Sequence, residues 1–374
     1  MKRGEQNLKG KLQKGRFPLS GSLELTHRCN LRCQHCYVNL PASDKAAKNK
    51  ELSSEEIFRV IDEAAECGLL SLLLTGGEPL LRHDFKEIYL YIKRKGVFIT
   101  LYTNGTLIDS EMGDFLAEWP PFFVQISLYG ATAQTYEAVT GIRGSYGRCM
   151  DGIQRLIERK IPLRLKAIVM TLNHQEVNEM EKLAGNLGCP FRYGTFLNPR
   201  LDGRGDPLKF RLPPEQVLAI DLERPTRMRE YRKRCLHCPE ASTSRALYPC
   251  DAGRRMFHID PSGKLTVCML SRTRQYDLRL GNFKEAWLEW IPKRVLSQKR
   301  EPLPCDGCNL RLLCANCTAF SELEMGKSGG VVPYLCEWTH LLAKTLGIQP
   351  NTPIFQTREE DDGKKMQEED KERI

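Results

Sequence analysis

The sequence predicts an α/β fold built on a parallel sheet, followed by a small cysteine-rich region. Between about residue 21 and residue 199, short apolar runs alternate with amphipathic stretches in six β–α units. The runs are nearly continuous in apolar residues, which is typical of parallel strands. A doubly wound sheet and an open or closed barrel share this pattern, so it leaves these architectures open. In each of these architectures, the functional residues lie on loops at the carboxyl ends of the strands.

The stretches between the apolar runs carry signals for the start of helices. Ser53 and Glu56 form a capping box in front of apolar residues at helical spacing. Asn173 and Glu176 repeat that box before a second periodic stretch, and Cys149 lies on the apolar face of another. The expected strands cover residues 22–26, 71–75, 98–103, 122–128, 163–170 and 191–196.

After residue 212 the pattern changes. One further helix is expected over residues 214–234, and a region with little periodicity follows. Within it, residues 256–269 predict a hairpin, because Pro261, Ser262 and Gly263 supply turn chemistry between two alternating strands. A region with so few core residues needs staples, and metal clusters can serve as them.

Composition and charge exclude several classes of protein. A hydrophobic content of 41% excludes a wholly disordered or fibrous chain. No apolar run approaches the roughly 18 residues of a membrane span, and the basic N-terminus lacks the apolar core of a secretory signal. We therefore expect a cytoplasmic protein with no membrane association. Six bases fall within residues 224–234, either as a solvated helix face or as a docking surface for an acidic partner, and no nucleic-acid motif accompanies them.

The chain contains 15 cysteines. Disulfides are not expected in a reducing cytoplasm, so the spacing of the thiols indicates metal. Cys67, Cys149 and Cys189 stand alone beside or within apolar faces and are interpreted as core residues. The others are grouped as Cys29, Cys33 and Cys36; Cys235 and Cys238; Cys250 and Cys268; and Cys305, Cys308, Cys314, Cys317 and Cys336.

The first cysteine group directly follows the first expected strand. Cys29, Cys33 and Cys36 therefore share one loop at the carboxyl end of the sheet. Three thiolates suit an iron–sulfur cube better than tetrahedral zinc, which takes four ligands. An iron with only three protein ligands keeps a position open for a substrate or cofactor, whereas a structural site is closed.

The segment CNLRCQHCY (residues 29–37) resembles the C-x3-C-x2-C signature of the radical S-adenosylmethionine (radical SAM) enzymes. The family's GGEP loop has its counterpart in residues 76–79, and residues 103–105 and 127–130 resemble its next two strand ends. The resemblance covers residues 21 to about 200. It implies a partial (β/α)6 TIM-type barrel with a small Cys-rich iron–sulfur C-terminal domain. It also implies reductive cleavage of SAM to a 5′-deoxyadenosyl radical, which abstracts hydrogen from the substrate.

The resemblance also implies roles for individual residues. The three loop cysteines would hold a 4Fe–4S cluster, and Glu78 would accept from the amino group of SAM. The two glycines would let backbone groups approach the cofactor. Many relatives bind the SAM carboxylate with an arginine at the position of Thr140; Arg143 lies three residues on, and neither residue is assigned that role. The expected SAM-binding residues are Gly76, Gly77, Glu78, Pro79, Asn104 and Ser127, and no catalytic acid or base is assigned.

The C-terminal cysteines resemble the SPASM extension, which in relatives holds two auxiliary 4Fe–4S clusters. The pattern departs at one point, since two residues rather than three separate Cys314 from Cys317. Zinc ribbons are the alternative for paired Cys-x2-Cys motifs. The resemblance implies one auxiliary cluster on Cys305, Cys308, Cys314 and Cys336. It implies another on Cys250, Cys268, Cys317 and an upstream cysteine, Cys238 in preference to Cys235, which makes three clusters in all.

The expected organisation follows from these motifs. It comprises a basic N-terminal extension (1–20), the partial barrel (21–212), a linker helix (213–235), the SPASM domain (236–346) and a charged, disordered tail (347–374).

SPASM relatives mostly modify ribosomal peptides or proteins, and others act on tetrapyrrole side chains. We expect a peptide or protein substrate that is crosslinked, epimerised or oxidised, with tetrapyrrole modification as the alternative. A non-catalytic iron–sulfur carrier or scaffold is the alternative of another class, but a carrier needs no GGEP loop. The expected partners are the substrate and a flavodoxin- or ferredoxin-type electron donor. About 20 residues before the first strand are too few for a leader-recognition domain. For a substrate with a leader, we therefore also expect a separate leader-peptide recognition protein.

Overall fold

The computed structural model describes residues 15–38, 40–236 and 245–355, and the chain divides into two compact units. The first unit comprises residues 1–212 with 246–299, and the second comprises 213–245 with 300–374. The expected boundary at residue 236 differs from this division, because residues 246–299 pack with the barrel.

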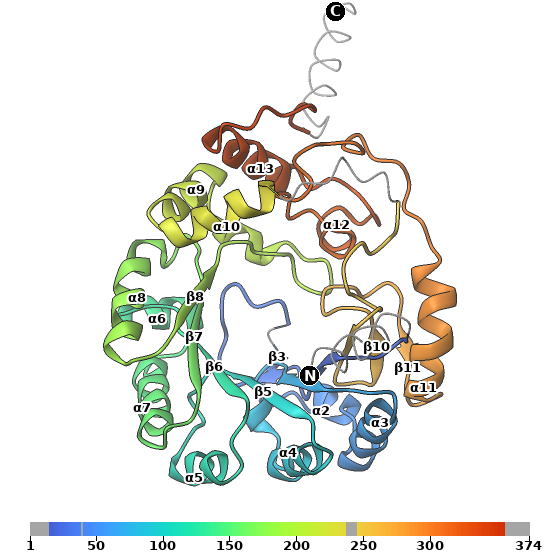
Figure 1. Ribbon diagram of the computed structural model, residues 1–374. Helices are drawn as coiled ribbons and strands as arrows, with labels where there is room; N and C mark the ends of the chain where they lie inside the picture. Colours follow the sequence, from blue (N-terminus) through green and yellow to red (C-terminus); the bar gives the residue numbers. More distant parts are fainter. Residues whose placement is uncertain (1–14, 39, 237–244, 356–374) are drawn as a thin grey trace, which may run out of the picture. The chain divides into compact units, whose positions relative to one another are not determined.

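The first unit contains a nine-stranded sheet in the order β11-β10-β9-β1-β4-β5-β6-β7-β8. The strands from β1 to β8 pair in parallel, and the connections between them carry helices, so they form the expected partial (β/α)6 barrel (Figure 1). These strands are β1 (Ser20–Glu24), β4 (Ser71–Thr75), β5 (Phe98–Thr103), β6 (Phe123–Ser127), β7 (Leu163–Ile168) and β8 (Phe191–Gly194).

Helices cover the outer side of this sheet (Figure 1). The capping box is confirmed, since the Ser53 hydroxyl accepts from the Glu56 amide and the Glu56 carboxylate accepts from the Ser53 amide. The helices of the barrel are α3 (Ser54–Glu66), α4 (Phe85–Arg94), α5 (Ser110–Glu118), α6 (Ala133–Thr140), α7 (Ser145–Glu158) and α8 (Val177–Asn186).

The second predicted capping box is wrong. The side chain of Asn173 accepts from the Met170 amide at 2.8 Å and donates to the Tyr129 carbonyl at 3.0 Å. Glu176 instead accepts from the amide of Ala131 at 2.7 Å. Both side chains bind the backbone at neighbouring strand ends, so neither is left to cap α8.

The barrel strands have two unlike faces. In β5 and β6 the residues Leu101 and Val124 are fully buried on the side that the helices cover. Tyr102 and Gln125 alternate with them and are half-buried on the concave side. The partial barrel therefore presents a largely polar interior rather than a packed apolar one.

The predicted hairpin is confirmed and extends the barrel sheet. Strand β9 (Met256–Ile259) pairs in parallel with β1, and β10 (Lys264–Thr266) pairs with β9 in antiparallel fashion. Gly263 has φ 84° in the turn, a conformation that favours glycine. The remaining elements of the first unit are β2 (Arg28–Cys29), β3 (Leu40–Pro41), α2 (Lys45–Lys50), η1 (Pro79–Leu81), η2 (His174–Glu176), η3 (Asp206–Phe210), β11 (Tyr276–Asp277), α11 (Phe283–Glu285), η4 (Ala286–Trp290) and η5 (Pro292–Leu296).

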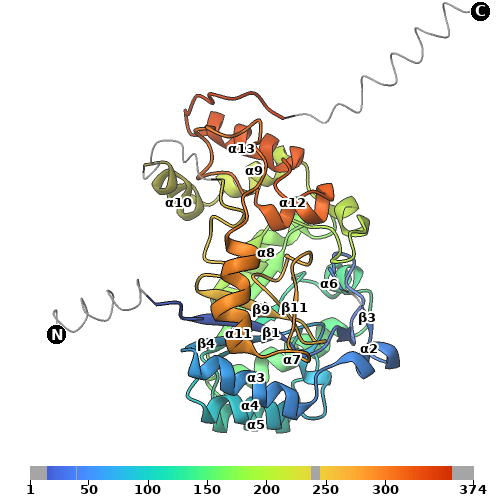
Figure 2. The ribbon, with the colours of Figure 1, turned by 90° about the vertical axis from the view of Figure 1, so that its right-hand side faces the viewer.

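The second unit contains α9 (Pro214–Leu222), α10 (Pro225–Leu236), α12 (Thr318–Met325) and α13 (Pro333–Thr345), and α9 packs against α13 (Figure 2). The single helix predicted over residues 214–234 is therefore wrong. Proline has no amide hydrogen for the helical ladder, so a new helix begins at Pro225. The Tyr231 hydroxyl of α10 donates to Asp221 of α9 at 2.8 Å and connects the two helices.

Two further expectations concern the lone cysteines and the membrane. Cys149 and Cys189 are buried, as predicted, whereas Cys67 is only half-buried. Within the described residues, no helix is long and apolar enough to cross a membrane.

Candidate functional site

The cysteine loop, residues 29–36, lies at the carboxyl end of β1 and is held by the end of α6. The amide of Arg32 donates to the carbonyl of Thr140 at 2.9 Å. The amide of Gln34 donates to the carbonyl of Val139 at the same distance. Backbone bonds therefore fix the middle of the loop without help from its thiols.

The three thiols of this loop lie close enough to affect one another. All three are half-buried and none of them is in a disulfide, and the sulfur of Cys29 accepts from the Leu31 amide at 3.4 Å. Burial, Glu78 and Cys36 raise the pKa of Cys29 to about 12. Burial, Cys36 and Cys29 likewise raise the pKa of Cys33. Because the thiols resist losing their protons, a positively charged group is needed to stabilise three thiolates side by side. The iron–sulfur core of a 4Fe–4S cluster supplies that charge.

The two glycines of the GGEP turn are required by the backbone that leads into the loop. A Cβ at Gly76 would lie 2.2 Å from the carbonyl oxygen of Thr26, and one at Gly77 would lie 2.3 Å from that of Arg28. The amides of Gly77 and Glu78 donate to these same carbonyls at 2.7 and 2.9 Å. The close approach thus joins the GGEP turn to the cysteine loop, a role that we did not expect.

Glu78 is fully buried at this turn, directly before Pro79. Its carboxylate accepts from the Thr103 hydroxyl at 2.7 Å and from the amides of Asn104 and Leu80 at 2.8 and 3.1 Å. Burial raises its pKa to about 7, although these hydrogen bonds oppose the rise. A carboxylate has about four acceptor positions, so one remains for an ammonium group.

Asn104 supports the cysteine loop. Its amide donates to the side chain of Asn30 at 2.9 Å and to the sulfur of Cys29 at 3.8 Å. Its carbonyl oxygen accepts from the amide of Thr106 at 2.9 Å. Ser127, the other residue expected at the ribose or methionine end of SAM, is half-buried at the end of β6. The SAM contacts of Asn104 and Ser127 stay predictions.

Thr140, at the position that holds an arginine in many relatives, is buried and already hydrogen-bonded. The hydroxyl of Thr140 is buried and pairs with that of Ser145 at 2.8 Å. Arg143 is exposed. The structure therefore adds no support for a carboxylate-binding role at Thr140.

Sequence reasoning misses Glu24, which is fully buried on β1. It accepts from the Tyr37 hydroxyl at 3.0 Å and lies 2.9, 3.2 and 3.3 Å from nitrogens of His27, Arg272 and His258. Burial alone would raise the pKa of Glu24, but His258 and His27 hold it well below its usual range. An acid inside the apolar run SLELT is the signal that could have found it. The Glu24 cluster joins both ends of the cysteine loop to β9 and the segment after it.

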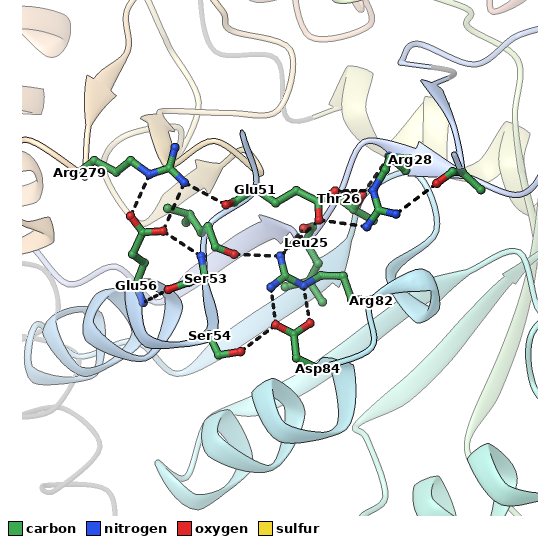
Figure 3. A network of polar contacts seen from close by, with 12 residues as sticks. Leu25, Thr26, Arg28, Glu51, Ser53, Ser54, Glu56, Arg82, Asp84 and Arg279 are labelled. Carbon is green, nitrogen blue, oxygen red and sulfur yellow. Dashed lines mark hydrogen bonds and ion pairs between the residues drawn. The ribbon is translucent and has the colours of Figure 1, made fainter. Parts of the chain in front are cut away.

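A second polar network connects Arg28, Glu51 and Arg82 (Figure 3). The buried carboxylate of Glu51 accepts from Arg28 at 2.8 and 3.1 Å and lies 3.8 Å from Arg82. Arg82 also donates to the carbonyl of Leu52 at 3.0 Å and to the carboxylate of Asp84. Although burial would raise it, hydrogen bonds from Arg82 and Ser54 lower the pKa of Asp84 to about 2. The network fixes the start of the cysteine loop to the turn that follows GGEP.

A separate group of thiols lies wholly within the second unit. Burial raises the pKa of Cys305, and so do the nearby thiols of Cys314 and Cys308. Burial raises the pKa of Cys314 as well, and the thiols of Cys336 and Cys308 add to the rise. Leu310 donates its amide to the sulfur of Cys308 at 3.4 Å. Four cysteines that converge in this way fit a closed 4Fe–4S site.

The other predicted auxiliary set is not brought together in one unit. Cys250 is exposed and Cys268 is half-buried in the first unit. Cys317 is exposed in the second unit, where its sulfur accepts from the Phe320 amide at the start of α12. Cys238 lies outside the described residues. This ligand set stays a prediction.

Within the described residues, no three His, Cys, Asp or Glu side chains form a group that could hold a single metal ion.

The concave face of the barrel carries cations on β7 and β8. Arg164 and Lys166 alternate with buried residues of β7, and Lys166 lies beside Arg192 of β8 in the sheet register. The guanidinium of Arg164 lies 3.9 Å from the ring centre of Phe123. Burial lowers the pKa of Lys166. We find no carboxylate paired with these three cations within the described chain, so this face suits an anionic ligand.

The basic stretch of residues 224–234 divides into two parts. Arg224 is buried and donates to the carbonyl of Ile220, and Arg227 pairs with Asp221 at 2.7 Å. Arg229 and Arg232 are exposed. The bases near Pro225 thus stabilise the α9–α10 corner, and only the later ones fit a docking surface.

A partial (β/α)6 barrel with three cysteines on the loop after its first strand is the arrangement expected of an enzyme that binds an iron–sulfur cluster through three protein ligands. Residues 23–186, which make up most of the barrel, match the family model described as the Radical SAM superfamily. This family match implies a 4Fe–4S cluster and S-adenosylmethionine.

The similarity to known proteins extends beyond the barrel. The chain is 29% identical over 346 residues to the AdoMet-dependent heme synthase of Methanosarcina barkeri, covering 83% of this chain and 94% of the relative. It is 26% identical to the PqqA peptide cyclase of Methylocella silvestris, covering 78% of this chain and 82% of the relative. Its fold matches Streptococcus suis SuiB bound to the precursor peptide SuiA, with a TM-score of 0.65, 17% identity and coverage of 85% and 76%.

Proposed function

We propose that this radical SAM enzyme abstracts hydrogen from a ribosomal peptide or protein and so crosslinks, epimerises or oxidises it. The observation that carries the proposal is the three-thiol loop joined to the GGEP turn. Bound there, the cluster and SAM supply a 5′-deoxyadenosyl radical. The residues of this chain hold both groups and orient them: the loop cysteines provide three ligands, and the free acceptor position of Glu78 takes the SAM ammonium group.

A peptide substrate is supported by the relatives and by charge. PqqA peptide cyclase and the SuiB–SuiA complex both connect this fold with peptides. Arg164, Lys166 and Arg192 on the concave face have no carboxylate partner among the described residues, which favours a substrate that carries carboxylates. A separate leader-recognition protein and a flavodoxin- or ferredoxin-type donor complete the proposal, with a cytoplasmic location where thiols stay reduced.

The full proposal includes three 4Fe–4S clusters. The loop cysteines and the group Cys305, Cys308, Cys314 and Cys336 support two of them by their arrangement. The third, on Cys250, Cys268, Cys317 and Cys238, is supported by the sequence resemblance alone.

A tetrapyrrole is the second candidate substrate. It is favoured by the match to the heme synthase, which spans 94% of that relative. Propionate side chains would also satisfy the cations on the concave face.

One experiment separates the two candidates. Reconstituted enzyme receives SAM, dithionite and, in separate arms, a small precursor peptide encoded beside its gene or iron coproporphyrin III. Each arm is analysed by mass spectrometry, and 5′-deoxyadenosine is measured in parallel. Peptide modification predicts a mass change in the peptide arm only. Oxidation of the tetrapyrrole alone would overturn the peptide proposal in favour of the second candidate.

A further inference from the structure

Residues 349–355, which we name the C-terminal strap, follow α13 in the second unit and belong to the stretch expected as a disordered tail. The strap is docked on the turn that carries Cys308. The amide of Asn309 donates to the side chain of Asn351 at 2.9 Å, and the amide of Asn351 donates back to Asn309 at 3.2 Å. Asn351 also donates to the carbonyl of Gly307, and Asn309 to that of Gln349, at 2.9 and 2.8 Å. The rest of the expected tail, residues 356–374, lies outside the described residues.

The strap also reaches the thiols. The hydroxyl of Thr352 donates to the sulfur of Cys308 at 3.1 Å. The amide of Phe355 donates to the sulfur of Cys336 at 3.4 Å. The carbonyl of Thr352 lies 2.9 Å from Nε2 of His340, which fixes the strap to α13. Two of the four thiols of the group thus receive a hydrogen bond from this one segment.

Donors of this kind act on the charge of an iron–sulfur site. Hydrogen bonds to the sulfurs and solvent exposure are two of the factors that set the reduction potential of such a cluster. A donor stabilises the more negative, reduced state, because a hydrogen bond to a charged acceptor is stronger. A segment that covers the sulfurs also limits the access of water and oxygen.

We propose that the C-terminal strap is part of the auxiliary site. Thr352 and the Phe355 amide raise the reduction potential of the cluster through Cys308 and Cys336, and the docked strap shields that cluster. Thr352 is a positioning and tuning residue, since it acts through a ligand. The inference rests on the proposed 4Fe–4S cluster at Cys305, Cys308, Cys314 and Cys336.

The first test measures the potential of that cluster in the full chain. Cys29, Cys33 and Cys36 are replaced by alanine, which removes the signal of the first cluster. Thr352→Val is then compared with Thr352→Ser, which keeps the hydroxyl, in a redox titration with dithionite followed by electron paramagnetic resonance. The signal of interest is the one that Cys305→Ala abolishes. We expect the valine variant to have a more negative midpoint potential and the serine variant to match its parent.

Equal midpoints in the valine and serine variants would overturn the tuning role of Thr352. The absence of any signal that depends on Cys305 would instead overturn the cluster assignment on which the inference rests. The two failures are therefore distinguishable.

The second test measures shielding. Asn351→Ala removes the side chain that binds the Cys308 turn, and Gln349→Ala is the matched control, because only the backbone carbonyl of this exposed residue docks. We expect iron to pass to a chelator in air several-fold faster from the Asn351 variant than from the control. Equal rates would overturn the shielding role.

Discussion

The two groups of cysteines in this protein, its two thiol centres, differ in how the surrounding chain holds them. The cysteine loop of the first unit is fixed by backbone bonds to α6, by the GGEP turn and by the buried networks around Glu24 and Glu51. The four-cysteine group of the second unit lies in turns between residues 300 and 317, in α13 and beside the strap, with little regular structure around it. We therefore expect the first centre to be organised before metal binds and the second to depend more on its metal for order.

This difference matches the chemistry proposed for each centre. A cluster that must keep one iron open for SAM cannot rely on a fourth thiolate to fix its position, so the scaffold does that work. A closed cluster with four thiolates can itself act as the staple of a small domain.

Removing metal ligands from the second centre should have the largest effect, and it tests whether that centre depends on its metal for order. Cys305→Ala with Cys308→Ala should remove about four of about 12 irons per chain. Because these thiolates also order the second unit, its thermal unfolding temperature should fall sharply. Iron analysis and calorimetry check both. If the double variant keeps its iron, the ligand set is wrong.

The scaffold of the first centre should respond to loss of its buried charge. Glu51→Ala leaves the buried Arg28 without its carboxylate and Arg82 with Asp84 alone, and should lower the free energy of unfolding by about 3–5 kcal/mol. Glu289→Ala is the matched control, since its pair with Lys293 is more than half exposed and should cost at most about 1 kcal/mol. Denaturant unfolding measures the two. Equal losses would show that the Glu51 network does not stabilise the loop.

The GGEP contact offers a smaller perturbation at the same place. Gly77→Ala pushes a methyl group against the carbonyl of Arg28, 2.3 Å away, and should destabilise the unit by about 1–3 kcal/mol while displacing the cysteine loop. Gly185→Ala in α8 meets nothing within 4 Å and should stabilise by about 0.5–1 kcal/mol. Unfolding curves and bound iron are compared for both. Unchanged iron content and stability in the Gly77 variant would contradict the contact.

The pH dependence of SAM binding sharpens the role of Glu78. Its pKa of about 7 means that the carboxyl group gains a proton as the pH falls through neutrality. The protonated acid is a poorer acceptor for the SAM ammonium group, so affinity should fall by at most about tenfold between about pH 7.5 and about pH 6. Glu78→Gln should flatten that dependence, because an amide does not titrate. An unchanged slope in the glutamine variant, measured by calorimetry, would exclude Glu78 as its source.

The sequence predicts the barrel well because its signals are local. The runs at residues 71–75 and 98–103 coincide with β4 and β5, and the Ser53 capping box forms as expected. The cysteine loop is readable for the same reason, since its ligands lie within eight residues.

Apart from the helix break at Pro225, the main failures involve partners that lie far apart in the chain. Glu176 leaves its predicted cap for an amide 45 residues earlier, and Glu24 meets His258, which follows it by more than 200 residues. The strap is polar and lacks periodicity, so its sequence predicts a disordered tail. In the structure, however, Asn351 binds Asn309 across 42 residues. No local pattern encodes such pairs.

The most direct test of the account is the release of 5′-deoxyadenosine from SAM under dithionite, compared across three anaerobically reconstituted proteins. The wild type should release it, and so should the Cys305→Ala, Cys308→Ala variant, at least in part, because the open centre is intact. The variant with alanine at Cys29, Cys33 and Cys36 should release none. Release from that triple variant, or its absence from the wild type, would contradict the assignment of the cysteine loop as the SAM-cleaving centre.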